Sequence, residues 1–576
     1  MKILGLNVFH ADTAACLIVD GKIIAAVEEE RFTRIKHFTG FPKNSIDFCL
    51  KEYNIDISEI DAICVNFNKN YNFKEKFLFS LKNFNSINFY RKAFFSLKKN
   101  SLNKLFKKFY KEENIIDKVI NVPHHLAHIC STYLYNDIKE ESIGFSYDGS
   151  GDFSTVEIYK LGAKIELLEK TNYPHSFGVF YQAFTQFLGF KNYGDEYKVM
   201  GLASYGDPIY KDRIKKIIQN ENNFLELNLD YFDHHQTVID YDFDSGYPFF
   251  DDLYSSKFEQ LFGKSRGINE PILKMHKDLA SSLQTAFEEI ILEKLQSLHK
   301  KYKVDNLCLS GGCTFNSSLN GKIIKYSNFK KVYFSPNVGD AGGAMGAALY
   351  YAKKKGEKIV FNADPYIGTS YDDKFVEEKI IEKIKNIDHI QFKYFDDFEE
   401  LCKKTLEVVT DNGVVGWFQD KMEWGPRALG NRSIICDPRN PMMRDIINIK
   451  IKKREEFRPF APVVLEEKAK DYFDISDKSE FMCAVFEAKN KIKDIIPAVV
   501  HVDNTSRVQT VSEQSNKKLF TLIKEFEKLT SIPILLNTSL NINEPICENP
   551  ENALEIFTKT SMDAIVIQNW LLTKKK

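Results

Sequence analysis

The sequence predicts an α/β protein with two domains. A unit of three short strands occurs twice in the first half of the chain, and two glycine-rich turns in the same half each join a strand to a helix. Near residue 355 the chain becomes polar and turn-rich before a second α/β stretch begins. The 576 residues also exceed the roughly 250–300 at which a single hydrophobic core stops growing, so more than one core is expected.

The repeated unit has the order strand, polar turn, strand, tight turn, strand. Its first copy covers residues 2–30 and its second copy covers residues 142–169. Asp20-Gly21 in the first copy is a strong hairpin signal, because both residues tolerate the positive φ of a type I′ turn. Two such units, each opening on a small polar loop, are typical of the duplicated actin-like and sugar-kinase-like ATPase fold. Two unrelated β-meanders are the alternative.

Two glycine-rich turns follow the second copy. Residues 304–327 run from a strand through Gly311 and Gly312 into a helix, and residues 331–354 run from a strand through NVGDAGGAMG into an alanine-rich helix. Turns of this kind expose backbone N–H groups at the positive end of a helix, which favours phosphate. The two turns therefore indicate a nucleotide site in the first half of the chain.

The polar segment AKKKGEKIVFNADPYIG marks the expected domain boundary, at residues 355–370. We therefore expect domains at residues 1–360 and 361–576. Residues 70–112 stand out in the first domain because they are basic and rich in phenylalanine. Phe and Leu recur there at three and four residues, which predicts a helical insertion beside the active site. A surface that binds nucleic acid or a membrane is the alternative.

Composition disfavours several classes of partner. The 79 Lys and Arg residues balance the 80 Asp and Glu residues, and the net charge of -1 creates no global field that would attract nucleic acid or an anionic membrane. No apolar run approaches the roughly 18–20 residues of a membrane-spanning helix. The ten cysteines form no C-x-x-C pair, and Met1–Val8 is not a secretory signal. We expect free thiols in the cytoplasm and no cysteine-based zinc site.

The motif HHLAH predicts a metal site. His124 and His128 are spaced i, i+4, so on a helix they share one face and can bind one divalent ion such as iron or zinc. Asp148 ends an apolar strand at Gly149, and Asp340 lies in the GDAGG turn. Taken singly, each aspartate could be a turn or helix cap. Taken together, the two histidines and two aspartates predict a four-ligand metal centre beside the nucleotide.

The second half of the chain predicts an anion site. Seven cations alternate there with Trp, Leu, Ile, Phe and Pro, and cations embedded in apolar sequence require an anion. Internal ion pairs with Glu423, Asp437, Glu455 and Glu456 are the alternative, and we expect about four of the seven to meet a ligand. Asn537 begins NTSLNINEP, whose amides and hydroxyls could orient a small polar substrate. The seven cations are Arg427, Arg432, Arg439, Lys452, Arg454, Arg458 and Arg507.

Nine motifs are spread in one order along nearly the whole chain. They are AAVEEERFTRIKH, HHLAH, SYDGSGD, GDEYKVMGLASYG, LSGGCTFN, GDAGGAMGAAL, EWGPRALGNRS, REEFRPFAP and NTSLNINEPI. With these motifs the chain resembles the NodU/CmcH family of O-carbamoyltransferases, which includes nodulation-factor, cephalosporin and tobramycin carbamoyltransferases. The resemblance implies an N-terminal TsaD-like ATPase-fold domain and a C-terminal YrdC-like α/β domain.

The resemblance also implies roles for single residues. It implies iron(II), or another divalent metal, at His124, His128, Asp148 and Asp340, and nucleotide binding at Gly149, Gly311, Gly312 and Asn316. It implies a carbamoyl phosphate pocket at Arg427, Lys452, Arg458, Arg507 and Asn537. Catalysis would then involve His10, Lys452 and Arg458. The family usually has His-Asp-x-Ser where this chain has His10-Ala11-Asp12-Thr13, so the contacts to the acceptor stay open.

These expectations describe an enzyme with two reactions. In the C-terminal domain, carbamoyl phosphate and ATP with Mg²⁺ form carbamoyl-adenylate. In the N-terminal domain, the carbamoyl group passes to a hydroxyl of a small-molecule or sugar acceptor. A homodimer is compatible with this scheme. The acceptor itself is left open.

Four other functions fit the sequence less well. A threonylcarbamoyl-type tRNA-modification enzyme would share both domain types but should have a tRNA-sized basic face. A hydrogenase-maturation carbamoyltransferase would add cysteine zinc fingers and an acylphosphatase-like domain. A sugar kinase would leave residues 423–545 unexplained, and a scaffold would leave both constellations without a role.

Overall fold

The computed structural model divides into two compact units, unit 1 from Met1 to Ala363 and unit 2 from Asp364 to Lys576. Among the described residues, every helix is too short or too polar to cross a bilayer. The structure describes residues 1–82, 102–112, 115–218, 224–236, 240–242, 246–249, 251–361, 364–385 and 387–575.

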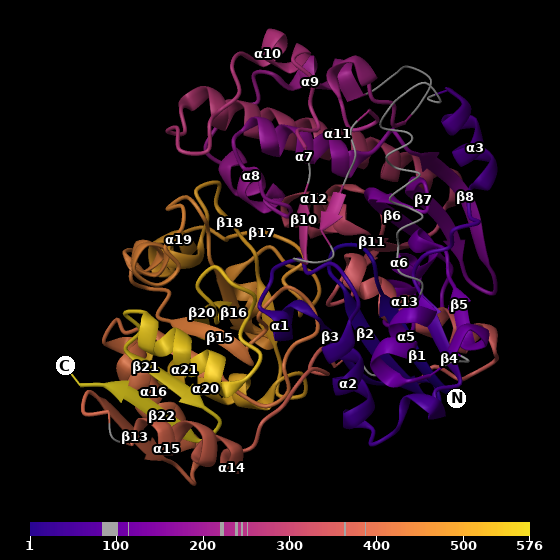
Figure 1. Ribbon diagram of the computed structural model, residues 1–576. Helices are drawn as coiled ribbons and strands as arrows, with labels where there is room; N and C mark the ends of the chain where they lie inside the picture. Colours follow the sequence, from indigo (N-terminus) through magenta and orange to yellow (C-terminus); the bar gives the residue numbers. More distant parts are fainter. Residues whose placement is uncertain are drawn as a thin grey trace. The chain divides into compact units, whose positions relative to one another are not determined.

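The first sheet of unit 1 has five strands in the order β3-β2-β1-β4-β5 (Figure 1). β1, β2 and β3 are antiparallel neighbours, whereas β4 and β5 run parallel to β1. Asp20 and Gly21 both have positive φ, 48° and 74°, as a type I′ turn between β2 and β3 requires. The strands are β1 (Lys2–Asn7), β2 (Ala14–Val19), β3 (Lys22–Glu28), β4 (Ala62–Val65) and β5 (Val119–Asn121).

The second sheet of unit 1 repeats this arrangement, in the order β8-β7-β6-β11-β12. β6, β7 and β8 form an antiparallel meander, and β11 and β12 run parallel to β6. Three antiparallel strands followed by two parallel ones in both sheets confirm the predicted duplicated α/β fold. The strands are β6 (Ser142–Gly151), β7 (Ser154–Leu161), β8 (Ile165–Asn172), β11 (Asn306–Ser310) and β12 (Lys331–Tyr333).

Helices α6 (His124–Tyr133) and α13 (Asp340–Lys354) pack against each other, and α13 also packs on β1 (Figure 1). These contacts bring backbones together. A Cβ on Gly346 of α13 would lie 1.8 Å from the carbonyl oxygen of Ala127 in α6, and a Cβ on Gly5 of β1 would lie 2.0 Å from that of Ala344 in α13. The small residues of GDAGGAMGAAL therefore serve packing as well as the turn.

The predicted insertion at residues 70–112 is described only at its two ends. Helix α3 (Phe73–Lys82) packs Phe79 against Phe153 and Tyr173, with ring centroids 5.5 Å from each. Helix α5 (Leu102–Tyr110) buries Phe106 in the core beneath the first sheet. Residues 83–101, in the middle of the prediction, lie outside the described residues. The insertion and its role stay a prediction.

The other described helices of unit 1 lie around the two sheets, and the described part of unit 1 also has a short hairpin, β9 (Asp240–Asp242) and β10 (Tyr247–Phe249). The helices are α1 (Glu30–Thr33), α2 (Lys43–Glu52), α3 (Phe73–Lys82), α5 (Leu102–Tyr110), α7 (Phe177–Phe187), α8 (Glu196–Ala203), α9 (Lys211–Ile218), α10 (Lys257–Phe262), α11 (Lys274–Tyr302) and α12 (Ser317–Tyr326).

Unit 2 is built on a mixed sheet of eight strands in the order β13-β22-β21-β14-β15-β20-β16-β19 (Figure 1). Only the pairs β14–β21 and β16–β19 are parallel among the neighbours of this described sheet. The strands are β13 (Ile390–Tyr394), β14 (Val415–Phe418), β15 (Arg432–Cys436), β16 (Ala461–Leu465), β19 (Gln509–Val511), β20 (Ile534–Ser539), β21 (Ala564–Ile567) and β22 (Trp570–Lys574).

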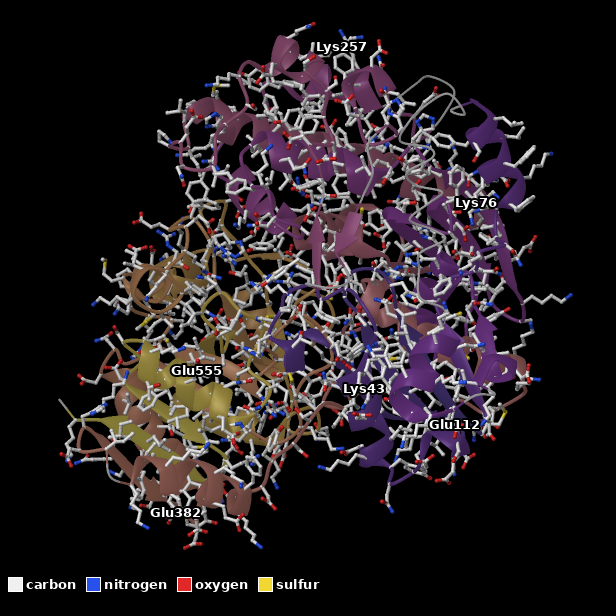
Figure 2. The ribbon with its side chains drawn as sticks, in the orientation of Figure 1. Lys43, Lys76, Glu112, Lys257, Glu382 and Glu555 are labelled. Atoms are coloured by element: carbon white, nitrogen blue, oxygen red, sulfur yellow. The ribbon has the colours of Figure 1, made fainter. Side chains whose placement is uncertain are left out.

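Helices α16 (Phe398–Thr410) and α20 (Lys517–Thr530) bury Leu406 and Phe526 against Trp417 in the core of this unit. α21 (Pro550–Lys559) packs on β14 and β21. The charged side chains of Glu382 and Glu555 lie on the outer surface of unit 2 (Figure 2). The short elements are α14 (Asp373–Val376), α15 (Glu382–Ile384), α17 (Met443–Asp445), α18 (Ala469–Tyr472), α19 (Ile492–Ile495), β17 (Phe486–Glu487) and β18 (Thr505–Ser506).

The α6–α13 contact makes a stability prediction. Gly→Ala inside a helix usually stabilises it by about 1 kcal/mol, but Gly346→Ala should destabilise unit 1 by about 1–3 kcal/mol, because its Cβ has no room against Ala127. Urea unfolding measures the change. Gly162→Ala, in the turn between β7 and β8, is the control for a Gly→Ala change without a clash, since its nearest contact would be an ordinary 3.5 Å to Glu141. A more stable Gly346→Ala protein would contradict the packing.

Candidate functional site

Helix α6 presents two histidines on one face. It begins at His124, directly after Pro123, and His128 follows one turn later. Their Nε2 atoms lie 3.0 Å apart, and both side chains are buried. Gly151 leaves room for the first histidine, because a Cβ at that position would lie 2.0 Å from the His124 ring. The histidines are therefore held close together inside unit 1.

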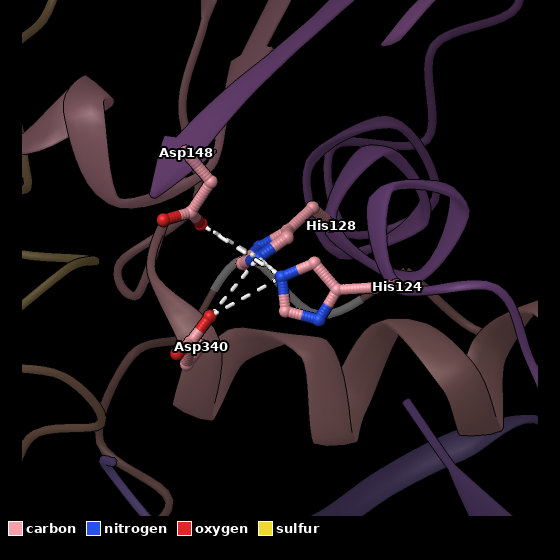
Figure 3. Close-up of side chains that lie close together, drawn as sticks. All are labelled: His124, His128, Asp148 and Asp340. Atoms are coloured by element: carbon pink, nitrogen blue, oxygen red, sulfur yellow. Dashed lines mark hydrogen bonds and ion pairs between the residues drawn. The ribbon is translucent and has the colours of Figure 1, made fainter. Parts of the chain in front are cut away.

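Two aspartates from distant elements face these histidines (Figure 3). Asp148 lies in β6, and Asp340 is the first residue of α13. Nε2 of His128 lies 3.1 Å from Oδ2 of Asp148 and 3.3 Å from Oδ1 of Asp340, and Nε2 of His124 lies 3.4 Å from the same Asp340 oxygen. One ligand atom from each of the four residues lies within 4.8 Å of the others. The structure thus brings together all four residues predicted as metal ligands.

The carboxylates and imidazoles of this cluster shift one another's pKa values. Burial alone would lower the pKa of His128, but the neighbouring carboxylates of Asp148 and Asp340 outweigh it and raise the pKa to about 9. Burial alone would raise the pKa of Asp148, but the neighbouring histidines His124 and His128 hold it well below its usual value. Both carboxylates therefore stay ionised and require positive charge nearby, either from imidazole protons or from a cation.

The four residues fit a divalent metal ion. Oδ1 of Asp340 is buried and faces both histidines, yet it accepts no hydrogen bond from any residue that the structure describes. Two imidazole nitrogens and two carboxylate oxygens form a donor set that zinc, iron(II) and other first-row ions accept. A cation between them would satisfy the oxygen that the protein leaves without a donor.

His10 lies beside this cluster. Its Nδ1 is 3.3 Å from Oδ2 of Asp340, and its ring meets the ring of His124 edge-on, with centroids 5.8 Å apart. One oxygen of Asp340 thus faces the histidines of α6 and the other faces His10. The position suits a group that moves a proton next to the candidate metal.

The first glycine-rich turn is attached directly to Asp148. The N–H of Gly312 donates to Oδ2 of Asp148 at 2.9 Å, and the N–H of Gly149 donates to Oδ1 at 2.6 Å. Gly311 has a φ of 92°, and a Cβ there would lie 2.3 Å from the carbonyl oxygen of Tyr147. The turn needs glycine at this point, and it places the predicted nucleotide residues against the cluster.

Asn316, the fourth predicted nucleotide residue, has internal partners. Its Oδ1 caps α12 by accepting the N–H of Leu319 at 3.0 Å, and its Nδ2 donates to Oε1 of Gln284 at 2.9 Å. These bonds give Asn316 a structural role in the turn, whatever it contacts in a complex.

Sequence reasoning missed Asp152. Its carboxylate accepts the backbone N–H groups of His124 and Asn68, at 2.9 Å and 2.8 Å. Pro123 supplies no side-chain cap for α6, so Asp152 provides the negative charge that a helix N-terminus favours. It thereby orients the helix that carries both histidines. The available signal was the second aspartate of SYDGSGD, four residues after Asp148.

Unit 2 contains a cluster of arginines around Arg507. Burial lowers the pKa of Arg507 well below its usual value, and the nearby charges of Arg427 and Arg454 lower it further, as does Arg458. Its Nε is buried and has no hydrogen-bond partner within the described part of the chain. Like charges gathered in a half-buried site favour an anion as their partner. The structure thus brings three predicted pocket residues, Arg427, Arg458 and Arg507, to one place.

The other two predicted pocket residues lie at β20: Lys452 holds the end of the strand and the residues after it, and Asn537 belongs to the strand. Lys452 is buried, and its Nζ donates to the carbonyl and Oδ1 of Asn541, at 2.8 Å and 2.7 Å, and to the carbonyl of Ser539. Nδ2 of Asn537 donates to Gln509 at 2.7 Å. The Oδ1 of Asn537 is buried and accepts no hydrogen bond from a described residue, so it is an acceptor suited to a ligand N–H group.

Like Lys452, four more of the seven predicted cations have partners inside unit 2. The guanidinium of Arg432 is fully buried, stacks over Phe418 at 3.6 Å and donates to the carbonyl of Thr369 at 3.0 Å. Arg439 forms a two-pronged ion pair with Asp437.

Two arginines of the cluster at Arg507 also have partners. Nη1 of Arg458 lies 3.6 Å from Oε2 of Glu455, and Nε of Arg454 donates to Oδ1 of Asn448 at 2.7 Å. The pairs of Arg439 and Arg458 fit the alternative of internal ion pairs.

We expect metal binding to depend on His128. Replacing it by Ala removes one of four donors and should weaken binding of iron(II) or zinc more than about 100-fold, since even supporting residues cost 10–100-fold. Titration calorimetry of anaerobic, metal-stripped protein measures this. His125→Gln is the matched control, because His125 lies on the same helix and bonds Ser146 outside the cluster. Equal affinity of His128→Ala and the parent protein would remove His128 from the site.

Comparison with known proteins identifies the family. Two family models match the chain, described as Carbamoyltransferase N-terminus over residues 2–349 and Carbamoyltransferase C-terminus over residues 406–574. The uncharacterized protein sll1178 of Synechocystis sp. is 35% identical and covers 99% of this chain and 96% of its own. Nodulation protein NolNO of Sinorhizobium fredii is 34% identical over 99% and 80%.

Among solved structures, HypF of T. kodakarensis is 14% identical, with a TM-score of 0.32 over 62% of this chain and 48% of its own. That likeness is too slight to bear on function. The family models and the relatives confirm the resemblance inferred from the motifs, and the chain belongs to the carbamoyltransferase family of transferase enzymes.

Proposed function

We propose that this carbamoyltransferase uses carbamoyl phosphate and ATP to form carbamoyl-adenylate in unit 2 and transfers the carbamoyl group to a hydroxyl in unit 1. One observation carries the proposal: the two units contain chemically opposite sites. Unit 2 gathers arginines around Arg507, whose Nε has no hydrogen-bond partner among the described residues and suits an anion, whereas unit 1 gathers carboxylates and imidazoles that suit a cation.

The first reaction suits the arginine cluster. Water cleaves carbamoyl phosphate to carbamate and phosphate, and a carbamate oxygen then attacks the α-phosphorus of ATP, which is bound with Mg²⁺. Pyrophosphate leaves as carbamoyl-adenylate forms. Arg427, Arg458 and Arg507 would neutralise the charge that grows on phosphoryl oxygens. Asn537 would accept an N–H of the carbamoyl group through its Oδ1, and Lys452 would keep the Ser539–Asn541 loop in place.

The second reaction suits the cluster in unit 1. The acceptor hydroxyl attacks the carbamoyl carbon, His10 takes the hydroxyl proton, and AMP leaves as the carbamate ester forms. The glycine turn at Gly149, Gly311 and Gly312, with Asn316, would hold the adenosine part. His124, His128, Asp148 and Asp340 would hold a divalent metal, iron(II) by resemblance to the family, which supplies Lewis-acid polarisation and charge neutralisation. The acceptor is proposed only as a hydroxyl-bearing small molecule or sugar.

The two sites should be separable by experiment. Arg507→Gln removes a half-buried cation from the proposed pocket and should slow pyrophosphate release that depends on carbamoyl phosphate by about 10²-fold. When pre-formed carbamoyl-adenylate is supplied with glycerol as a hydroxyl probe, the same variant should release AMP at the parent rate. His124→Ala should show the opposite pattern. Both rates can be followed by mass spectrometry of nucleotides and carbamoylated glycerol.

The matched control is Arg444→Gln, a partly exposed arginine of the same unit paired only loosely with Asp445, at 3.4 Å. It should change neither rate. The two-site mechanism is wrong if Arg507→Gln, although folded, remains inactive with carbamoyl-adenylate present, or if it forms pyrophosphate as fast as the parent protein.

A further inference from the structure

The loop that carries His10 has a backbone that needs support. Phe9 and Asp12, on either side of His10, both have positive φ, 68° and 59°. Residues other than glycine adopt this conformation only where the surroundings enforce it. Nδ2 of Asn7 donates to the carbonyls of Ala11 and Asp12, at 3.0 Å and 2.7 Å. The loop is therefore shaped by contacts with other parts of unit 1.

The segment from His37 to Gly40 supplies most of those contacts. The N–H of Phe9 donates to the carbonyl of Gly40 at 3.1 Å, and the N–H of Thr13 donates to the carbonyl of Phe38 at 3.0 Å. The N–H of Gly40 donates in return to Oγ1 of Thr13 at 3.1 Å. Hydrogen bonds thus join the segment from His37 to Gly40 to the loop on both sides of His10.

An ion pair closes this arrangement. Nδ1 of His37 lies 2.8 Å from Oδ1 of Asp12, and the backbone N–H of His37 donates to Oε2 of Glu30 at 2.7 Å. The ring of Tyr193 meets the His37 ring edge-on at 5.0 Å, and Gly194 lies so close that a Cβ would be 2.4 Å from Nε2. A defined neighbour therefore lies beside each ring nitrogen and against the ring, although 32% of the side chain stays exposed.

We propose that His37 and Asp12 form an ionic clasp that positions His10 against Asp340 for the transfer reaction. The clasp rests on the proposed function of unit 1. His37 and Asp12 are positioning residues, because neither touches Asp340 or the α6 histidines, whereas His10, two residues from Asp12, lies 3.3 Å from Asp340. The role also accounts for the motif AAVEEERFTRIKH, which ends at His37.

Electrostatics supports a charged clasp. Burial alone would lower the pKa of His37, but Asp12 and Glu30 outweigh it and raise the pKa to about 9. The like charge of Lys36 opposes the two carboxylates. Glu196 also lies near enough for the charge of His37 to lower its pKa. A group whose pKa is raised on folding stabilises the folded protein fully at a pH below its unfolded pKa, which is 6.5 here. That stabilisation is lost as the pH rises through the group's pKa in the folded protein. The clasp should be intact at neutral pH and open above about pH 9.

A metal ion is the competing occupant of this place, because Asp12, Glu30 and His37 also put ligand atoms within 4.8 Å of one another. A metal would need His37 neutral, whereas two carboxylates that favour its protonated form suit an ion pair. Metal content therefore belongs in the test, and a variant at His37 should retain the metal of the parent protein.

The test compares His37→Gln, Asp12→Asn and the double variant, with the exposed His389→Gln as control. AMP release from supplied carbamoyl-adenylate with glycerol is measured from pH 6 to pH 10. We expect each single variant to lower kcat about tenfold or more at pH 7, because small displacements of a reacting group are costly, with KM for carbamoyl-adenylate unchanged. The double variant should be no slower than either single variant. The parent should lose its advantage over His37→Gln as pH rises through about 9.

Three results would overturn the clasp: additive losses in the double variant, an equal parent-to-variant ratio at pH 7 and pH 10, or loss of metal from His37→Gln. If the parent protein itself releases no AMP, the proposed function fails and the clasp is decided by urea unfolding. In that case a coupling between Asp12 and His37 that disappears above about pH 9 supports it, and the absence of coupling at pH 7 overturns it.

Discussion

The backbone contact between α6 and α13 is the constraint on which the candidate metal site depends. His128 and Asp340 are 212 residues apart in the chain, and they meet because Gly346 lets α13 approach Ala127 to a distance that no side chain would permit. The second sheet adds Asp148, near the end of β6, and Asp152 caps the helix that carries the histidines. A larger residue at Gly346 or Gly151 would therefore disturb the cluster without removing any of its four side chains.

The charged clusters of the two units have opposite signs, so each suits a ligand of the opposite charge. In unit 1, ionised carboxylates outweigh burial and raise the pKa of His128, whereas in unit 2 burial, and then the like charges of neighbouring arginines, lower the pKa of Arg507. Burying like charges is costly unless an opposite charge accompanies them. In the proposed carbamoyl-transfer cycle, phosphates would supply the missing charge in unit 2 and a metal would supply it in unit 1.

Residues of one type in one motif separate into different roles only in the folded chain. Arg427 and Arg432 both lie in EWGPRALGNRS. Arg432 donates to backbone carbonyls and stacks on Phe418, whereas Arg427 joins the cluster at Arg507. Lys452 looked like a substrate-binding cation, and the structure shows its ammonium holding Ser539 and Asn541. Sequence pattern indicates that cations are gathered, but the partner of each depends on which backbone oxygens fold beside it.

By itself the sequence determined the duplicated strand units, the glycine turns and the four residues that meet at the candidate metal site, because hydrophobic period, Asp-Gly turns and i, i+4 histidine spacing are local properties of the chain. The order of the strands within each sheet was decided by the tertiary structure. Only the tertiary structure decided that Asp152 caps α6, that Asn316 bonds Gln284, and that His37 closes on Asp12. Each of these pairs joins residues 25 or more positions apart, and such contacts depend on how whole elements pack, which no short window of sequence records.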